Sequence, residues 1–298
     1  MDLRKMTTET RNQNSMNLDT MTSLEIATTM NNEDKRVPLA IEKELPKIAK
    51  IIDAVAEAFE GGHRLFYMGA GTSGRLGILD ASECPPTFGV EHGQVVGLIA
   101  GGERAIQYAV EKAEDSKELG ANDLKDHNLC SGDVVVGIAA SGRTPYVIGG
   151  MEYAKSLGCF VGSISSNKGS EIGQIADAAV ETVVGPEVLT GSSRLKSGTA
   201  QKMVCNMITT GAMIRTGKSY ENLMVNVVQS NEKLRVRAEN IVIDATGVER
   251  AHARELLDQA DGVAKVAIVM AILDCDCDEA KKRLKESGGH TRLAIGKE

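Results

Sequence analysis

The sequence contains no tryptophan, and its 298 residues include only four phenylalanines and five tyrosines. So few aromatic rings make it hard to build the stacking surfaces that hold nucleobases. An excess of basic charge is also missing, because the formal net charge is −7 at pH 7. Nucleic acid binding generally needs a basic face, so we expect no nucleic acid partner.

Long apolar runs are absent as well. No run reaches the roughly 20 residues that a membrane-spanning helix needs, and residues 1–17 are polar, unlike the apolar core of a signal peptide. The six cysteines are scattered through a chain large enough to fold without disulfides, so we expect free thiols. These observations predict a cytoplasmic protein without a membrane partner.

The sequence shows no spacing typical of a metal site. Its five histidines lack ligand spacing, and the run Asp274–Asp278, in which aspartate and cysteine alternate, contains no histidine. We interpret that run as an interhelical turn with an N-cap. We interpret His63, just before a predicted strand, as a structural residue, with a proton shuttle as the alternative. We therefore predict no metal and no other cofactor.

The sequence does have a regular alternation of short apolar runs and helical stretches. The apolar runs predict β-strands at 64–68, 95–99, 133–138, 160–164 and 179–184. Strands separated by helices are typical of a parallel sheet that is covered on both faces. The fold class is therefore α/β, with a doubly wound parallel sheet.

Helical patterns flank this central region. Apolar residues between 37 and 59 follow helical spacing, residues 198–240 read as helical, and three short helices are predicted at 251–257, 263–273 and 279–286. We therefore predict four segments: an N-terminal helical arm (1–53), the α/β domain (54–217), a connecting helix (218–239) and a small helical domain (240–298).

Two turns rich in glycine and hydroxyl residues each follow a predicted strand. We call Gly69–Arg75 the first glycine turn and Ala139–Pro145 the second glycine turn. A buried strand that enters such a turn and continues as a helix presents backbone N–H groups and a helix dipole to an anion. Two such turns in one domain indicate a small phosphorylated ligand at the carboxyl edge of the sheet.

The first glycine turn also matches the dinucleotide pattern G-x-G-x-x-G. A dinucleotide site would need an acidic residue about 20 positions further on, and Cys84–Pro86 in that region is expected to break the helix that such a unit requires. Glycines needed only for the geometry of the turn are the other alternative. The second glycine turn weakens both alternatives.

Four longer strings resemble the signatures of the N-acetylmuramic acid 6-phosphate etherases, a family with the sugar isomerase (SIS) fold. These strings are Leu79–Gly89, Ala113–Ser116, Ala140–Tyr146 and Gly185–Lys196. The similarity extends from Thr8–Asn12 almost to the carboxyl end. Small departures occur at Gln13, where proline is expected, and at Ser193 and Ser197, which replace threonine and alanine. None of them removes a carboxylate or a hydroxyl expected to bind phosphate.

The resemblance implies a function and an assembly. Such enzymes cleave the lactyl ether of N-acetylmuramic acid 6-phosphate with water, giving N-acetylglucosamine 6-phosphate and D-lactate, by elimination of lactate followed by addition of water. The chemistry needs acid and base groups but no metal. The resemblance also implies a homodimer, with residues 198–240 as a candidate interface, and a C-terminal three-helix bundle like a ubiquitin-associated domain.

The resemblance also assigns the site residues. Glu83 and Glu114 match the catalytic positions, with Glu83 protonating the lactate oxygen and Glu114 activating water; which of them removes the C2 proton stays open. We expect Glu114 on the inward flank of a helix whose apolar stripe spans 106–113, and Glu83 beside prolines that fix a turn. The expected phosphate and substrate ligands are Gly71, Thr72, Ser73, Gly74, Ser141, Gly142, Thr144, Ser192, Ser193 and Lys196.

Two other functions use the same glycine turns. One is an aldose–ketose isomerase of phosphosugars, which gives no reason for the sequence around Glu83 or for Ala113–Ser116. The other is a non-catalytic sensor of sugar phosphates, and a regulator of animal glucokinase resembles the etherases. A transcriptional sensor would need a basic helix-turn-helix arm, and the first 50 residues are not basic. The presence of Glu83 and Glu114 favours the enzyme.

Overall fold

The computed structural model describes residues 7–227 and 232–297. Its contacts divide the chain into two units, Met1–Ser82 with Gly93–Thr209, and Glu83–His92 with Thr210–Glu298. We call them the α/β unit and the helical unit. The predicted boundaries after residues 53 and 239 fall inside helices α3 (Leu45–Glu60) and α10 (Glu232–Thr246). The organisation into four segments stays a prediction.

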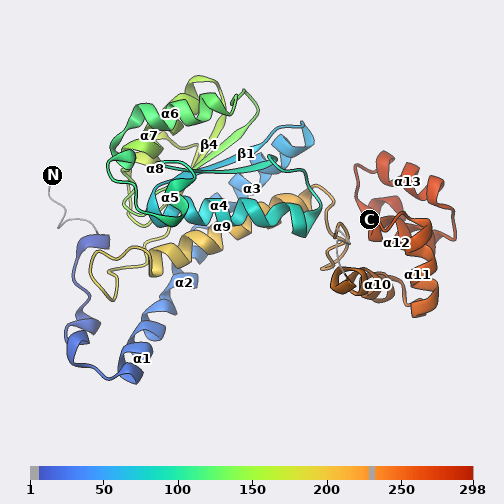
Figure 1. Cartoon of the computed structure of the whole chain (residues 1–298), viewed down its shortest axis with the longest axis horizontal. Helices are drawn as coiled ribbons and strands as arrows, with labels where there is room; N and C mark the ends of the chain where they lie inside the picture. Colours follow the sequence, from blue (N-terminus) through green and yellow to red (C-terminus); the bar gives the residue numbers. More distant parts are fainter. Residues whose placement is uncertain (1–6, 228–231, 298) are drawn as a thin grey trace. The chain divides into compact units, whose positions relative to one another are not determined.

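The α/β unit contains a five-stranded parallel sheet (Figure 1). The spatial order is β2-β1-β3-β4-β5, and the strands are β1 (Leu65–Gly69), β2 (Val95–Ile99), β3 (Val134–Ile138), β4 (Phe160–Ser165) and β5 (Ala178–Glu181). All five strands predicted from the sequence are confirmed, within one to three residues at their ends. The doubly wound α/β fold is confirmed with them.

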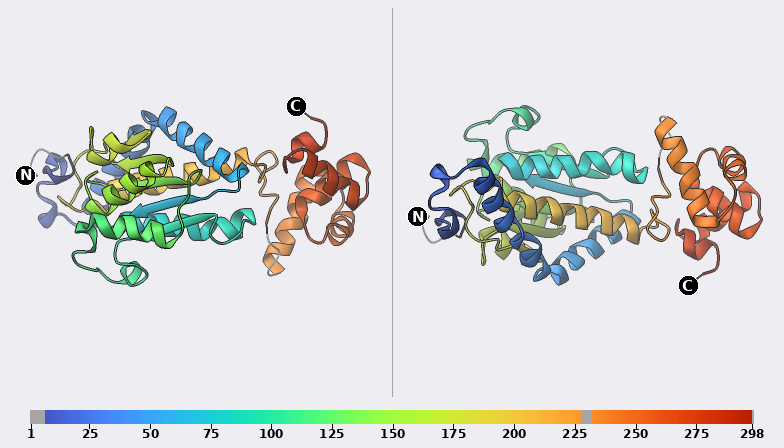
Figure 2. Two further views of the ribbon diagram at one scale, coloured as in Figure 1. Left: turned by 90° about the horizontal axis from the view of Figure 1, so that it is seen from above. Right: turned by 90° about the horizontal axis from the view of Figure 1, so that it is seen from below.

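Successive side chains of each strand face two different layers of helices. Phe66 and Met68 belong to a core that includes residues of α6 (Lys117–Asp126), α7 (Pro145–Ser156) and α8 (Glu171–Ile175). Tyr67 faces the other way, where its hydroxyl donates to the carbonyl oxygen of Cys205 at 3.1 Å. That side carries α3, α4 (Gly71–Phe88) and α9 (Lys196–Arg215). Figure 2 shows the layers from above and from below.

Helices α6 and α7 approach each other through glycines. A Cβ added to Gly120 of α6 would overlap the carbonyl oxygen of Tyr146, and one added to Gly149 of α7 would overlap the carbonyl oxygen of Lys117. Glycine allows this close approach because it has no side chain. The two helices therefore touch backbone to backbone.

The N-terminal arm begins with short 3-10 helices and continues in three α-helices. The 3-10 helices are Thr7–Glu9, Gln13–Ser15 and Leu18–Thr20, followed by α1 (Ser23–Asp34), α2 (Arg36–Glu42) and α3. The backbone N–H and the hydroxyl of Thr22 both bond to the Glu25 carboxylate, which completes a capping box. The continuous helix predicted over 37–59 is wrong, because α3 starts anew with Pro46 in its first turn.

The helical unit packs α10, α11 (Arg250–Gln259), α12 (Ala264–Leu273) and α13 (Cys277–Glu286) around one apolar core, with the short α14 (Thr291–Ala294) against it. The three helices predicted here are confirmed as α11 to α13. The helical pattern predicted over 198–240 is confirmed in part, because α9 ends at Arg215 and α10 begins at Glu232.

Two smaller predictions are also confirmed. The Asp276 carboxylate accepts a hydrogen bond from the Glu279 N–H at 2.9 Å and caps α13, as the interpretation of Asp274–Asp278 required. None of the six cysteines, all of which lie among the described residues, forms a disulfide. Among the described residues, no helix has both the length and the apolar character needed to cross a bilayer.

Candidate active site

The two glycine turns lie at neighbouring points of the sheet's carboxyl edge. Strands β1 and β3 pair in parallel, with Gly69 opposite Ile138, and a glycine turn follows each of these residues. The strand order turns back at β1 and β3, since β2 lies on one side of β1 and the later strands lie on the other. Open α/β sheets bind their ligands at such a switch point.

Some residues of the first glycine turn are accessible to solvent and others are buried. Gly71 is exposed and Thr72 is half-buried, whereas Ser73 and Gly74 are buried. The Ser73 hydroxyl donates to Gln201 Oε1 at 3.0 Å, which ties α4 to α9. A Cβ on Gly74 would come within 2.6 Å of Ile99 Cγ1, so this glycine lets α4 pack on strand β2. Gly71 and Thr72 are therefore the residues of this turn placed to meet a ligand.

The second glycine turn is held by its own backbone and by strand β4. The backbone N–H of Arg143 donates to Ser141 Oγ at 3.4 Å, and Gly142 has a φ of 73°. Asn167 Nδ2 donates to the carbonyl oxygen of Ala140 at 3.0 Å. Thr144 precedes α7, and its hydroxyl makes no capping bond. The sequence interpretation did not include Asn167, since nothing near it in the chain marks it as a partner of the turn.

At the N-terminus of α9, a carboxylate from the preceding loop accepts the backbone hydrogen bonds. The buried carboxylate of Glu187 accepts hydrogen bonds from the backbone N–H groups of Lys196 and Ser197 at 3.0 and 2.9 Å. A helix N-terminus favours negative charge, and here the chain itself supplies it. Ser192 and Ser193 are half-buried in the same loop.

Lys196 lies inside the fold. Its Nζ is 2.6 Å from Glu33 Oε2, and the side chain has no exposed surface. Burial would raise the pKa of Glu33, but hydrogen bonds from Lys196, Asn14 and Asn12 lower it to about 2. The structure therefore places Lys196 in a buried ion pair with Glu33. A Cβ on Gly198 would lie 3.5 Å from Thr72 Cγ2, so the start of α9 borders the first glycine turn.

Glu114 shares a pocket with the first glycine turn. The pocket has a volume of roughly 270 Å³, and its lining includes Gly71, Arg75, Glu111 and Glu114. Glu114 is exposed and lies in a 3-10 helix, Ala113–Asp115. The structure thus brings one predicted carboxylate and one predicted phosphate ligand together.

The helix predicted to carry Glu114 is wrong. Helix α5 covers only Arg104–Gln107, the backbone is extended at Tyr108, and Lys112 has a φ of 66°. A Cβ on Gly101 would come within 2.8 Å of Val110 Cβ, so Val110 packs on this glycine in place of a helix partner. The apolar residues between 106 and 113 were predicted to form a helix stripe, but here such a residue packs within a loop.

Arg75 is a site residue that the sequence interpretation did not assign. It lines the pocket, and its Nε donates to the carbonyl oxygen of Ile106 at 2.7 Å, which holds the guanidinium in place. The sequence did contain a signal for Arg75, because the string Ser-Gly-Arg occurs in both glycine turns, at Ser73–Arg75 and at Ser141–Arg143.

Glu83 is exposed on helix α4 and is grouped with the helical unit. The predicted helix break at Cys84–Pro86 is wrong, since α4 continues through both prolines to Phe88. The prolines lie in the last turn of the helix, and the Gly89 N–H still bonds to the carbonyl oxygen of Pro85 at 2.9 Å. Each proline lacks the N–H that would bond to the carbonyl oxygen four residues earlier, so this end of α4 has fewer backbone hydrogen bonds than the turns before it.

Comparison with known proteins agrees with this architecture. Residues 47–155 match the family model of the glucokinase regulatory protein N-terminal SIS domain, and residues 107–211 match that of the SIS domain. N-acetylmuramic acid 6-phosphate etherase of Escherichia coli O1:K1 is 58% identical over all 298 residues of both chains. The etherase of Shigella boydii serotype 18 is 57% identical, again over the full length of both chains. The chain belongs to the family of N-acetylmuramic acid 6-phosphate etherases.

Proposed function

We propose that this protein cleaves the D-lactyl ether of N-acetylmuramic acid 6-phosphate with water, giving N-acetylglucosamine 6-phosphate and D-lactate, in the recycling of cell-wall amino sugars. The observation that carries the proposal is the pocket shared by Gly71, Arg75 and Glu114 at the switch point of the sheet. Relatives named as etherases, 58% identical over the full length, support the same reaction.

The reaction proceeds by elimination and addition. The open-chain aldehyde of the sugar makes the C2 hydrogen acidic, and its removal expels lactate from C3, leaving a double bond between C2 and C3. The lactate oxygen receives a proton, and water then adds its hydroxyl to C3 and a proton to C2. We assign protonation of the lactate oxygen to Glu83 and activation of the water to Glu114, as general acid and base.

The phosphate is proposed to bind the two glycine turns. The N-termini of α4 and α7 provide backbone donors and favourable dipoles there, and the Arg75 guanidinium adds positive charge. The proposed ligands are Gly71, Thr72, Ser141, Gly142 and Thr144, with Ser192 and Ser193 from the loop before α9. Ser73, Gly74 and Lys196 are proposed to act by positioning these ligands, because each is buried.

We further propose a cytoplasmic homodimer that binds no nucleic acid. Contiguous apolar patches mark association surfaces, and the candidates for such a patch are Leu24, Leu39 and Leu189 of the α/β unit, which are 78, 60 and 57% exposed. Light scattering is expected to give twice the chain mass of 31.7 kDa, and one chain mass for a Leu24→Glu, Leu39→Glu variant. Glu42→Gln, at an exposed site of the same arm, is the control. A monomeric wild type would contradict the proposal.

The function is tested by incubating the purified protein with N-acetylmuramic acid 6-phosphate and EDTA in water enriched in oxygen-18. We expect D-lactate without the label and N-acetylglucosamine 6-phosphate with the label on C3, since the bond from C3 to oxygen breaks. Conversion to a ketose phosphate would favour an isomerase. Tight binding without any product would favour a sensor.

A further inference from the structure

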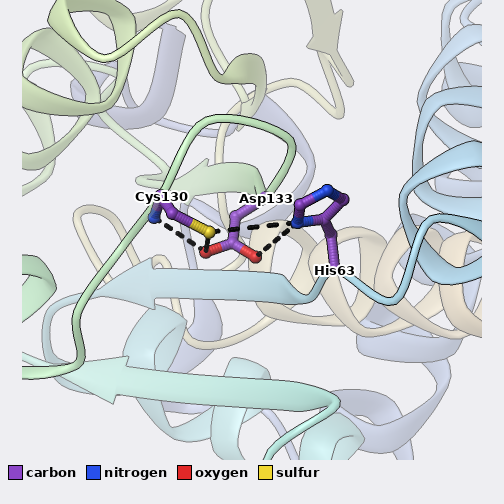
Figure 3. Close-up of side chains that lie close together, drawn as sticks. All are labelled: His63, Cys130 and Asp133. Atoms are coloured by element: carbon purple, nitrogen blue, oxygen red, sulfur yellow. Dashed lines mark hydrogen bonds and ion pairs between the residues drawn. The ribbon is translucent and has the colours of Figure 1, made fainter.

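A second cluster of reactive side chains lies at the opposite edge of the sheet. His63 comes just before β1, and Cys130 and Asp133 come just before β3 (Figure 3). These strands are neighbours, with Leu65 opposite Val134, so their amino ends bring the three side chains together. The whole length of the strands separates the cluster from the glycine turns, and the proposed reaction does not use it.

The three ligand atoms lie within a few tenths of an ångström of the spacing that a metal ion requires. Cys130 Sγ lies 3.9 Å from His63 Nδ1 and 3.4 Å from Asp133 Oδ2, and His63 Nδ1 lies 4.0 Å from Asp133 Oδ1. Tetrahedral coordination with bonds of about 2.0–2.3 Å separates ligand atoms by about 3.3–3.6 Å. Small rotations of the exposed Cys130 and of His63 therefore close the site.

Asp133 is fixed before any ion arrives. It is almost completely buried, and Arg64 Nη2 and Nε donate to its two oxygens at 2.7 and 3.3 Å. The backbone N–H groups of Arg64 and Cys130 also donate to it, at 2.9 and 3.0 Å. Such outer hydrogen bonds orient a metal-binding carboxylate. These four N–H donors take up about the four bonds that an ionised carboxylate accepts, so an ion on Oδ1 displaces the longest of them, the 3.3 Å contact from Arg64 Nε.

The His63 imidazole lies between Gly132 and an open pocket. A Cβ on Gly132 would come within 2.5 Å of His63 Nε2, so only glycine lets the imidazole stand at this place. Beside it opens a pocket of roughly 410 Å³, whose lining includes His63, Gly132 and Glu57. Three protein ligands and an open fourth position are typical of zinc sites that keep a water.

A nucleophilic cysteine is the competing interpretation. Partial desolvation of the sulfur and the neighbouring Asp133 raise the pKa of Cys130. Reactive cysteines need the opposite, a thiolate in an electropositive environment. A divalent metal replaces the thiol proton directly, so this obstacle does not apply to it.

We propose that His63 Nδ1, Cys130 Sγ and a carboxylate oxygen of Asp133 bind Zn²⁺ or a similar divalent ion. The Cys130 proton passes to solvent on binding, and His63 keeps its proton on Nε2. The thiolate and the carboxylate each bring a negative charge to the ion, while Arg64 stays on the carboxylate through Nη2. The ion joins the loop before β1 to the loop before β3 and so clamps the amino edge of the sheet.

The test uses Co²⁺ and the full-length protein. Bound in tetrahedral geometry by a thiolate, Co²⁺ gives a sulfur-to-metal charge-transfer band, and titration is expected to saturate at one ion per chain. His63→Ala and Cys130→Ser are expected to weaken binding at least about 100-fold, since a direct ligand matters more than an outer-shell partner, whose loss costs 10–100-fold. Both side chains are partly or fully exposed, so the variants keep the core intact.

The matched control is a Cys275→Ser, Cys277→Ser variant, which removes the thiols of the Asp274–Asp278 run. It is expected to bind Co²⁺ as the wild type does. Binding that survives His63→Ala and Cys130→Ser but disappears in this control would overturn the proposal, as would the absence of a charge-transfer band in the wild type. The metal-binding readout does not depend on lactate release, so it stands apart from the test of the proposed function.

Discussion

Lys196 Nζ and Glu33 Oε2 lie 2.6 Å apart, with 0 and 3% of their side chains exposed. Glu33 is in α1 and Lys196 begins α9, so the ion pair fastens the N-terminal arm to the helix that borders the first glycine turn. Asn12 and Asn14 also donate to the Glu33 carboxylate, at 2.9 and 2.8 Å. Removing one member of such a buried, hydrogen-bonded ion pair lowers the stability of the fold, because the other charge stays buried without a partner.

Glu33→Gln is expected to destabilise the protein by about 3–5 kcal/mol, because it leaves the Lys196 ammonium buried without a counter-charge. Urea unfolding followed by circular dichroism measures the change. Glu42→Gln, at an exposed position of the same arm, is the control and should change stability little. Equal stability of the two variants would mean that the pair contributes nothing net.

The same pair predicts a dependence on pH. The folded-state pKa of Glu33 is about 2, below its ordinary value of 4.5. A lowered carboxyl pKa contributes stability above the unfolded pKa, and this stability is lost as pH falls through the folded value. The difference in unfolding free energy between wild type and Glu33→Gln should therefore be full at pH 6 and shrink progressively from about pH 4.5 towards pH 2. A difference that stays constant over this range would contradict the assignment.

Glu114→Gln and Glu83→Gln are each expected to lower kcat for D-lactate release by about 10²–10⁴-fold, because proton transfer by a positioned carboxyl contributes that much. Glu118→Gln, an exposed carboxylate on the following helix, should keep the wild-type rate. Glu111→Gln tests the second carboxylate of the pocket. A full rate for Glu114→Gln together with a slow Glu111→Gln would move the water-activating role to Glu111.

Gly142→Ala is expected to raise KM for the sugar phosphate and to lower thermal stability. Gly142 has a φ of 73°, and an added Cβ would overlap Ser170, so the second glycine turn must shift. Gly158→Ala is the control, because Gly158 has a φ of 82° with open space around it. That control should show only the backbone cost, about 1–2 kcal/mol. A KM unchanged in Gly142→Ala would argue against phosphate binding at this turn.

The sheet was predictable from the sequence because its signals are local. Each strand is a short apolar run, and the glycine turns directly follow β1 and β3, so parallel pairing alone places the turns at one edge. The end of α4 at Phe88 was not predictable in the same way. A proline pair signals a helix end, but it does not say whether the helix stops before it or one turn later.

Contacts between distant residues account for the remaining differences. Lys196 follows a loop rich in hydroxyl groups and so resembles a phosphate ligand, but its partner Glu33 lies 163 residues earlier. His63 and Cys130 are 67 residues apart, a spacing that no metal motif describes. Such pairs become visible only when the folded chain is known.

The backbone contact of α6 and α7 at Gly120 and Gly149 fixes the distance between these two helices. The loop with Glu114 runs into α6 through Ser116, and the second glycine turn runs into α7 through Thr144. Since no side chain separates the two helices at these glycines, their spacing fixes the distance between Glu114 and the proposed phosphate site. In the proposed function, a sugar phosphate one carbon shorter would not reach Glu114 with its reacting carbons, so selectivity would depend on two glycines that touch no substrate.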